Sequence, residues 1–118
     1  MHSLSSIVDS GMAVKIVNFF PADKRQFVVR NIYKGSRDGW ETEKFTSRVF
    51  NKGPSLIVVK ATTGRICGGY TSKHWKESRV YIRDDDAFVF SLHNNTKYTP
   101  SNYDNAIGTR YKGFCFGN

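Results

Sequence analysis

Residues 53–71 of the chain read GPSLIVVKATTGRICGGYT, and this segment predicts a β-hairpin. Its first half, LIVV at 56–59, is a short apolar and mostly β-branched run, which is typical of a strand buried on both faces. The Thr-Thr-Gly sequence at 62–64 supplies the turn, because glycine takes a positive φ without steric cost. Residues 65–70 form the return strand, in which Gly68 and Gly69 indicate a bulge or a close approach of another segment. The hairpin carries no catalytic pattern, so we interpret it as the nucleus of the fold.

The remaining sequence predicts short elements around this hairpin. Apolar spacing predicts helices at about 9–20 and 41–50, the first capped by Asp9 or Ser10 and followed by Pro21. Alternation predicts strands at 26–34 and 87–92, and a final pair of strands at 106–109 and 113–116. Residues 35–39 and 94–105 are expected to be loops, because glycine, asparagine and serine are frequent there. The expected class is therefore α+β, mostly β, with short antiparallel strands and flanking helices.

Length and composition indicate one domain with a core of useful size. The 118 residues are 39% hydrophobic and 14% aromatic, which is ordinary globular composition. No run approaches the ~18 apolar residues of a membrane span, and the N-terminus lacks the pattern of a signal peptide. The two cysteines, Cys67 and Cys115, lie in apolar surroundings and are expected to be buried free thiols, although a disulfide between them is an alternative. These features predict a cytoplasmic protein.

The charge of the chain raises the alternative of a basic nucleic-acid-binding module. Its 18 basic and 10 acidic residues give a formal net charge of +8. The basic residues are dispersed along the sequence, however, and scattered lysines and arginines usually form a solvated surface. Nucleic-acid binding is therefore an alternative to the main interpretation.

Titratable residues that could carry chemistry do not form a recognisable constellation. Asp84-Asp85-Asp86 lacks the ligand spacing of a calcium loop and is expected to be solvated. The histidines, His2, His74 and His93, stand at no metal-ligand spacing from one another or from a cysteine. Cys67 lacks activating neighbours other than Arg65, and a small enzyme acting on oxidants through Cys67 or His74 is a further alternative. Arg37 and Asp38 are expected to form a structural ion pair. We therefore assign no catalytic, cofactor-binding or metal-binding residue, and no cofactor.

Several segments, in this order and spacing, resemble the TLDc (TLD) domain family from about residue 6 to residue 118. They are IYKGSRDGW at 32–40, NKGPSL at 51–56, GRICGGYT at 64–71, AFVFSL at 87–92 and GFCFG at 113–117, together with Phe45 and Trp75. The resemblance implies a two-sheet β-sandwich with a few flanking helices. It further implies a eukaryotic, non-enzymatic protein-interaction domain, linked to protection against oxidative stress and to regulation of the vacuolar proton-pumping ATPase.

The chain departs from this family at three places that affect the interpretation. Thr46, Val49 and Phe50 stand where the family often has a histidine and a Cys-Asp pair, so no redox or metal role is expected for the helix at 41–50. Cys67 stands where the family usually has an aromatic or aliphatic residue, which favours a packing role. The family also continues past the position of Asn118 with further strands, so residues 1–118 are expected to be a single TLDc-like domain shortened at its C-terminus. Without those strands a sheet edge could be exposed and could support self-association. Residues 1–5 are expected to be loose.

Overall fold

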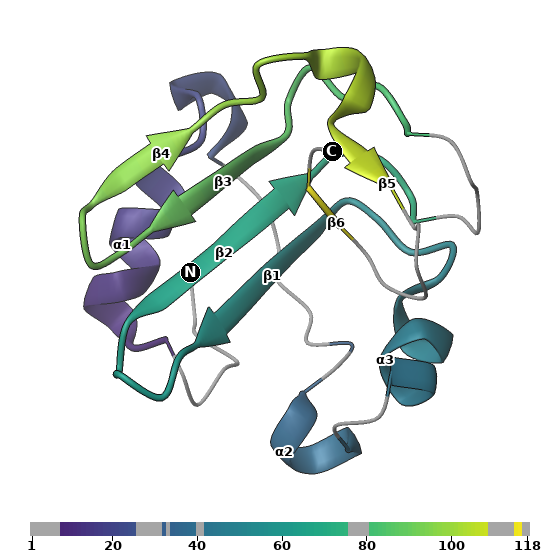
Figure 1. The fold of residues 1–118 in the computed structure, drawn as a ribbon. Helices are drawn as coiled ribbons and strands as arrows, with labels where there is room; N and C mark the ends of the chain where they lie inside the picture. Colours follow the sequence, from purple (N-terminus) through teal and green to yellow (C-terminus); the bar gives the residue numbers. More distant parts are fainter. Residues whose placement is uncertain are drawn as a thin grey trace.

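The computed structural model describes residues 8–25, 32, 34–39, 42–75, 81–108 and 115–116. At its centre is a four-stranded antiparallel sheet with the strand order β1-β2-β3-β4 (Figure 1). Its strands are β1 (Ser55–Lys60), β2 (Ile66–Thr71), β3 (Phe88–Ser91) and β4 (Thr96–Tyr98). A second sheet pairs β5 (Ile107–Gly108) with β6 (Cys115–Phe116), as expected for the last two strands. The α+β, mostly β class is confirmed, whereas the complete two-sheet sandwich stays a prediction.

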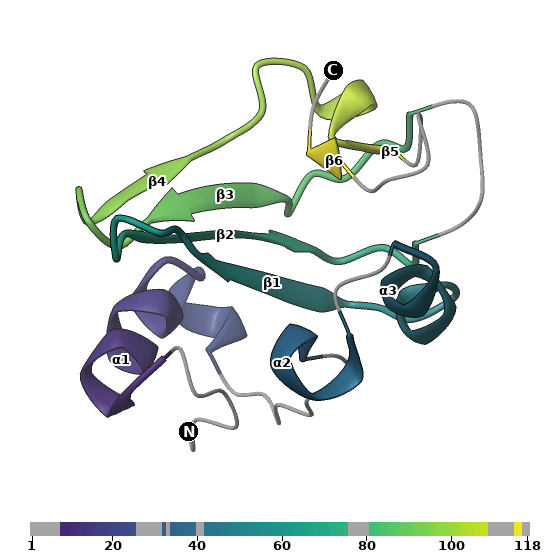
Figure 2. The same cartoon turned by 60° about the horizontal axis from the view of Figure 1, so that its bottom comes forward.

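The predicted hairpin is confirmed, with one correction to its burial. Ser55 pairs with Thr71 and Lys60 with Ile66 in an unbroken register, and Gly64 takes a φ of 90° in the turn. The expectation that β1 is buried on both faces was wrong, because its residues are only half-buried at best and Val59 is 51% exposed. The physical reason is its place in the sheet: among the described strands β1 is an edge strand, and β5 and β6 do not extend over its far end on the face opposite α1 (Figure 2).

One face of the sheet is covered by α1 (Ser10–Asn18), which confirms the first predicted helix (Figure 2). The Asp9 carboxylate accepts a hydrogen bond of 2.9 Å from the Met12 backbone N–H and so caps the helix. Helix residues Ala13 and Ile16 are buried in a core that includes Phe88 and Phe90 of β3. The inward alternation predicted for the strand at 87–92 is therefore confirmed.

The opposite face carries a second core, centred on Trp75. The Trp75 side chain is fully buried, and its indole N–H donates a 2.7 Å hydrogen bond to the Ser55 hydroxyl. The Phe116 ring of β6 packs edge-on against Trp75, with 5.5 Å between ring centroids. Val49 from α3 (Thr42–Val49) completes this side, and α3 confirms the second predicted helix. Because this core lies under β5 and β6, it covers only one end of the sheet (Figure 2).

The adjacent glycines of β2 are required by close packing from both sides of the sheet. A Cβ on Gly68 would collide with the Ile57 carbonyl oxygen and lie 2.6 Å from the Phe90 ring. A Cβ on Gly69 would lie 2.8 Å from two carbons of the Phe116 ring. Of the two predicted explanations, the close approach is confirmed, and the regular register excludes a bulge in β2.

Two predicted loops contain regular structure. Residues 35–38 form the helical turn α2 (Gly35–Asp38), which ends at Gly39 with a φ of 106°. The polar segment 94–105 contains β4 and the 3₁₀ turn η2 (Tyr103–Asn105), because tertiary pairing with β3 outweighs local polarity. A further 3₁₀ turn, η1 (Ala22–Lys24), follows α1. Most of the strand expected at 26–34, and the loose residues 1–5, lie outside the described residues. No helix in the described part of the chain is long and apolar enough to cross a membrane.

Candidate functional site

The sheet face opposite α1 is only partly covered, and its uncovered part is an apolar surface. Alternation along the strands places Val59, Cys67, Val89, Ser91 and Tyr98 on this side, which we call the open face. Val59 is 51% and Tyr98 48% exposed, and Cys67 is exposed as well. Val59 on β1 and Tyr98 on β4 lie at opposite edges of the sheet, with Cys67, Val89 and Ser91 between them. A sheet face that exposes apolar side chains in this way can bind another protein.

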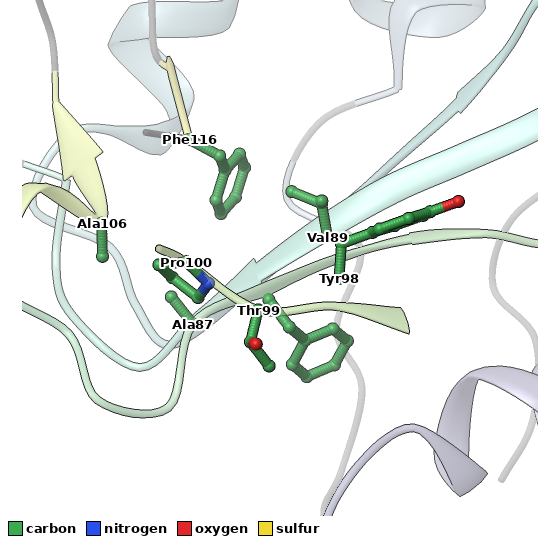
Figure 3. Close-up of a pocket in the computed structure, with 8 residues that line it drawn as sticks. Ala87, Val89, Tyr98, Thr99, Pro100, Ala106 and Phe116 are labelled. Carbon is green, nitrogen blue, oxygen red and sulfur yellow. The ribbon is translucent and has the colours of Figure 1, made fainter. Parts of the chain in front are cut away.

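A pocket adjoins the open face at the boundary between the two sheets (Figure 3). It has a volume of about 180 Å³ and is lined mainly by apolar side chains: Ala87, Val89, Tyr98, Pro100, Ala106 and Phe116. Thr99 is the polar residue of the lining, and the Tyr98 hydroxyl points away from the hollow (Figure 3). Figure 3 shows Phe116 and Ala106 on one side of the hollow and Val89 with Tyr98 on the other. Such a lining can bind an apolar group, and it contains no histidine, cysteine, aspartate or glutamate.

The segment that leads into β3, and so to Ala87 of the pocket lining, is held by the buried carboxylate of Asp84. It accepts hydrogen bonds from the Thr71 hydroxyl at 2.5 Å, the Ser72 hydroxyl at 2.6 Å and the Ser72 backbone N–H at 2.8 Å. The backbone N–H of Asp86 donates a fourth bond of 3.0 Å. Asp84 therefore joins the end of β2 to the segment that leads into β3.

Burial and hydrogen bonding act in opposite directions on Asp84. Burial alone would raise the pKa of the carboxyl, but the hydroxyls of Ser72 and Thr71 and the two backbone N–H groups together lower the pKa below its ordinary value. The expectation that the whole acidic triplet is solvated was therefore wrong for Asp84, which has no exposed surface. Asp85 and Asp86 are exposed as expected, and they form surface ion pairs with Arg83 and Lys24.

A second buried carboxylate, Asp38, stabilises the turn between α2 and α3. Arg37 donates two hydrogen bonds to it, of 2.7 and 2.9 Å, which confirms the predicted ion pair. The Lys34 backbone N–H adds a bond of 2.9 Å, and the guanidinium of Arg48 lies 3.7 Å away. The hydrogen bonds from Arg37 and Lys34 hold the pKa of Asp38 well below its usual range. Because these groups neutralise one another, we interpret the cluster as structural.

The residues considered for chemistry are not brought together. Cys67 is a free thiol but not a buried one, because its side of β2 belongs to the open face, and this corrects the expected packing role. His74 and His93 are exposed in loops outside the pocket lining. His2 and the side chain of Cys115 lie outside the described residues. Within the described segments, no group of three or more histidine, cysteine, aspartate or glutamate residues could hold a metal ion.

Sequence reasoning missed the pocket and its principal residue, Tyr98. The sequence signal for a strand here was weak. Thr96 and Tyr98 are β-prone residues in alternate positions, but the strand has only three residues and lies in a polar segment. They form a strand because Thr96 pairs with Ser91 and Tyr98 with Val89 of β3, rather than because of their own pattern.

Comparison with known proteins identifies the family of the chain. The chain matches the protein family described as "TLDc domain" over residues 1–118. Among curated proteins it is similar to the mTOR-associated protein MEAK7 of Gallus gallus, with 28% identity over 87 residues, covering 74% of this chain and 18% of the relative. The Xenopus laevis protein of the same name is 26% identical over 80 residues, covering 68% of this chain and 17% of the relative. The chain thus spans less than a fifth of the length of these relatives.

Proposed function

Because the chain belongs to the TLDc domain family, we propose that it is a non-enzymatic protein-interaction domain with a regulatory role. The observation that carries this proposal is the open face with its adjoining apolar pocket. These features provide a binding surface, while the buried carboxylates of the described residues are occupied by structural hydrogen bonds. A domain of this kind acts by occupying a partner's surface and thereby changing the partner's activity or assembly.

The partner that we propose is the vacuolar proton-pumping ATPase, in a cytoplasmic role linked to protection against oxidative stress. The family resemblance supports this choice, since the matching segments extend through almost the whole chain. The two relatives are named as associated with mTOR, which makes mTOR the alternative partner. For both partners we propose the open face as the contact surface.

The two alternative functions, a nucleic-acid-binding module and an enzyme acting on oxidants, have less support from the geometry. Several basic side chains are paired with acids, including Arg37 with Asp38 and Arg83 with Asp104, which reduces the charge available to a nucleic acid. An oxidant-degrading enzyme would need a pocket that joins Cys67 or His74 to an orienting acid, and the lining of the described pocket contains neither residue.

The test is binding between the purified chain and the purified ATPase at low salt, measured as co-elution from a gel-filtration column. We expect co-elution of the wild type and its loss in Val59→Asp, which places a charge on the open face. Val14→Asp is the matched control, because Val14 is equally apolar and 60% exposed but lies on α1, across the sheet. No co-elution of the wild type with either the ATPase or mTOR would overturn the proposal, and equal loss in both variants would remove the open face as the contact.

A further inference from the structure

The hydrogen-bonding direction of β3 shows which backbone groups of the sheet remain available. The Leu92 backbone N–H donates to the Ile66 carbonyl at 2.9 Å, so Leu92 directs its backbone groups toward β2. Successive residues of an antiparallel strand direct these groups to alternate sides. Val89 and Ser91 therefore direct theirs toward β4, where their register partners are Tyr98 and Thr96.

The same alternation leaves Lys97 with its backbone N–H and carbonyl pointing away from β3. Lys97 lies between Thr96 and Tyr98, whose groups pair with β3. In the described part of the chain β4 has no neighbour on its outer side, so it forms one edge of the four-stranded sheet (Figures 1 and 2). An extended peptide can add to such an edge as a further strand, through main-chain hydrogen bonds.

The side chains of β4 determine which residue types an added strand would need. Lys97 lies on the α1 side of the sheet, with its ammonium 4.8 Å from the centroid of the Phe88 ring. Tyr98 lies on the opposite side, where it lines the pocket together with Val89 and Pro100. A residue paired with Lys97 would place its side chain beside that ammonium. One of its neighbours would lie beside Tyr98, near the mouth of the pocket, and the other beside Thr96.

We propose that the outer edge of β4 binds an extended segment of a protein partner, in which an acidic residue lies next to an apolar residue that meets Tyr98. This inference rests on the proposed function, since it names the mode by which the domain would recognise a protein. Charge complementarity selects the occupant: an acid opposite Lys97 is favourable. A second copy of the chain is disfavoured, because antiparallel pairing of two β4 strands about Lys97 would oppose two ammonium groups, in a chain of net charge +8.

The experiment is an NMR titration of the ¹⁵N-labelled chain with a nine-residue peptide of alternating valine and glutamate. We expect shift changes at the amides of Lys97, Tyr98 and Thr99. A peptide of alternating valine and lysine should bind about 5–10-fold more weakly, since it opposes like charges across the pair. Lys97→Glu should invert this preference, while Lys60→Glu, the same charge change at the other edge strand, should leave it unchanged. Lys97→Gln, with no charge at the position, should bind both peptides alike.

Several outcomes would overturn the inference. Equal binding of a peptide with grouped rather than alternating glutamates would show attraction by net charge alone. Shift changes confined to residues outside 96–100, or no binding of either peptide, would exclude β4 as the edge that accepts a strand. Sedimentation that shows a dimer dissociated by Lys97→Pro, which removes the outward backbone N–H, would assign the edge to a second copy instead.

The failure of this inference can be distinguished from failure of the proposed function. If both Lys97 variants still co-elute with the ATPase or mTOR, the domain binds a protein but not through β4. If neither partner co-elutes with the wild type while the valine–glutamate peptide binds at Lys97, the edge accepts a strand and the proposed partners are wrong.

Discussion

Replacement of Asp84 by asparagine should destabilise the domain more than any other single charge-removing change at its acidic triplet. Each oxygen of the carboxylate accepts one hydroxyl and one backbone N–H: the Thr71 hydroxyl and Ser72 N–H on one, the Ser72 hydroxyl and Asp86 N–H on the other. A hydroxyl can rotate to accept from the new amide group, but a backbone N–H cannot. Either orientation of the asparagine therefore leaves one backbone N–H facing a donor.

The expected loss of stability follows from this one unsatisfied backbone N–H. An unsatisfied buried donor costs about 1–3 kcal/mol, and the remaining bonds weaken because the acceptor loses its charge, so we expect a loss of about 2–4 kcal/mol. For a domain of this size the melting temperature should fall by roughly 10 °C. The assay is urea unfolding at pH 7, followed by circular dichroism and supported by a thermal scan. Asp85→Asn is the matched control, because the Asp85 side chain is 66% exposed, and it should change stability by less than about 0.5 kcal/mol.

The pH dependence gives a second test of the same carboxylate. The pKa of Asp84 is lowered in the folded chain, so as the pH falls below about 4 the unfolded chain takes up the proton first. The stabilisation by the charged group is thus complete above that pH and is lost as the pH falls further. The stability difference between wild type and Asp84→Asn should therefore narrow from pH 7 to pH 3. A difference that stays constant over this range, or a variant as stable as the wild type at pH 7, would refute the reasoning.

Three other substitutions test the packing of the sheet. Gly69→Ala should cost about 1–3 kcal/mol in urea unfolding, because its Cβ would lie 2.8 Å from the Phe116 ring. Trp75→Phe should cost about 2–3 kcal/mol by the same assay, since it removes a buried hydrogen bond to Ser55 and leaves a void. Cys67 should react with a thiol reagent without unfolding, and Cys67→Ser should change stability by less than about 0.5 kcal/mol; a thiol protected in the folded chain would contradict its exposure.

Features decided by local chemistry could be predicted from the sequence. The turn at Gly64 and the inward positions of Phe88 and Phe90 follow from glycine conformation and strand alternation, which act within a few residues. The need for glycine at 68 and 69 was also readable, although the sequence could not identify Phe116 as one of the side chains that approach them.

Features decided by distant partners could not be predicted. The burial of Asp84 depends on Thr71 and Ser72, more than ten positions earlier in the chain, and its sequence neighbours gave no sign of them. The exposure of Cys67 depends on how far β5 and β6 extend over the sheet rather than on the apolar residues beside it in sequence. The strand β4 and the pocket at Tyr98 likewise exist because β3 supplies a partner.

The proposal that this domain binds a protein partner through its open face is tested most directly by hydrogen exchange. The purified chain is compared with and without the ATPase, or with mTOR, and amide protection is measured along the whole sheet. We expect the complex to slow exchange at Val59, at Val89 and at residues 96–99, with little change in α1. Protection confined to α1, α2 and α3, with unchanged exchange at the open face and β4, would contradict it.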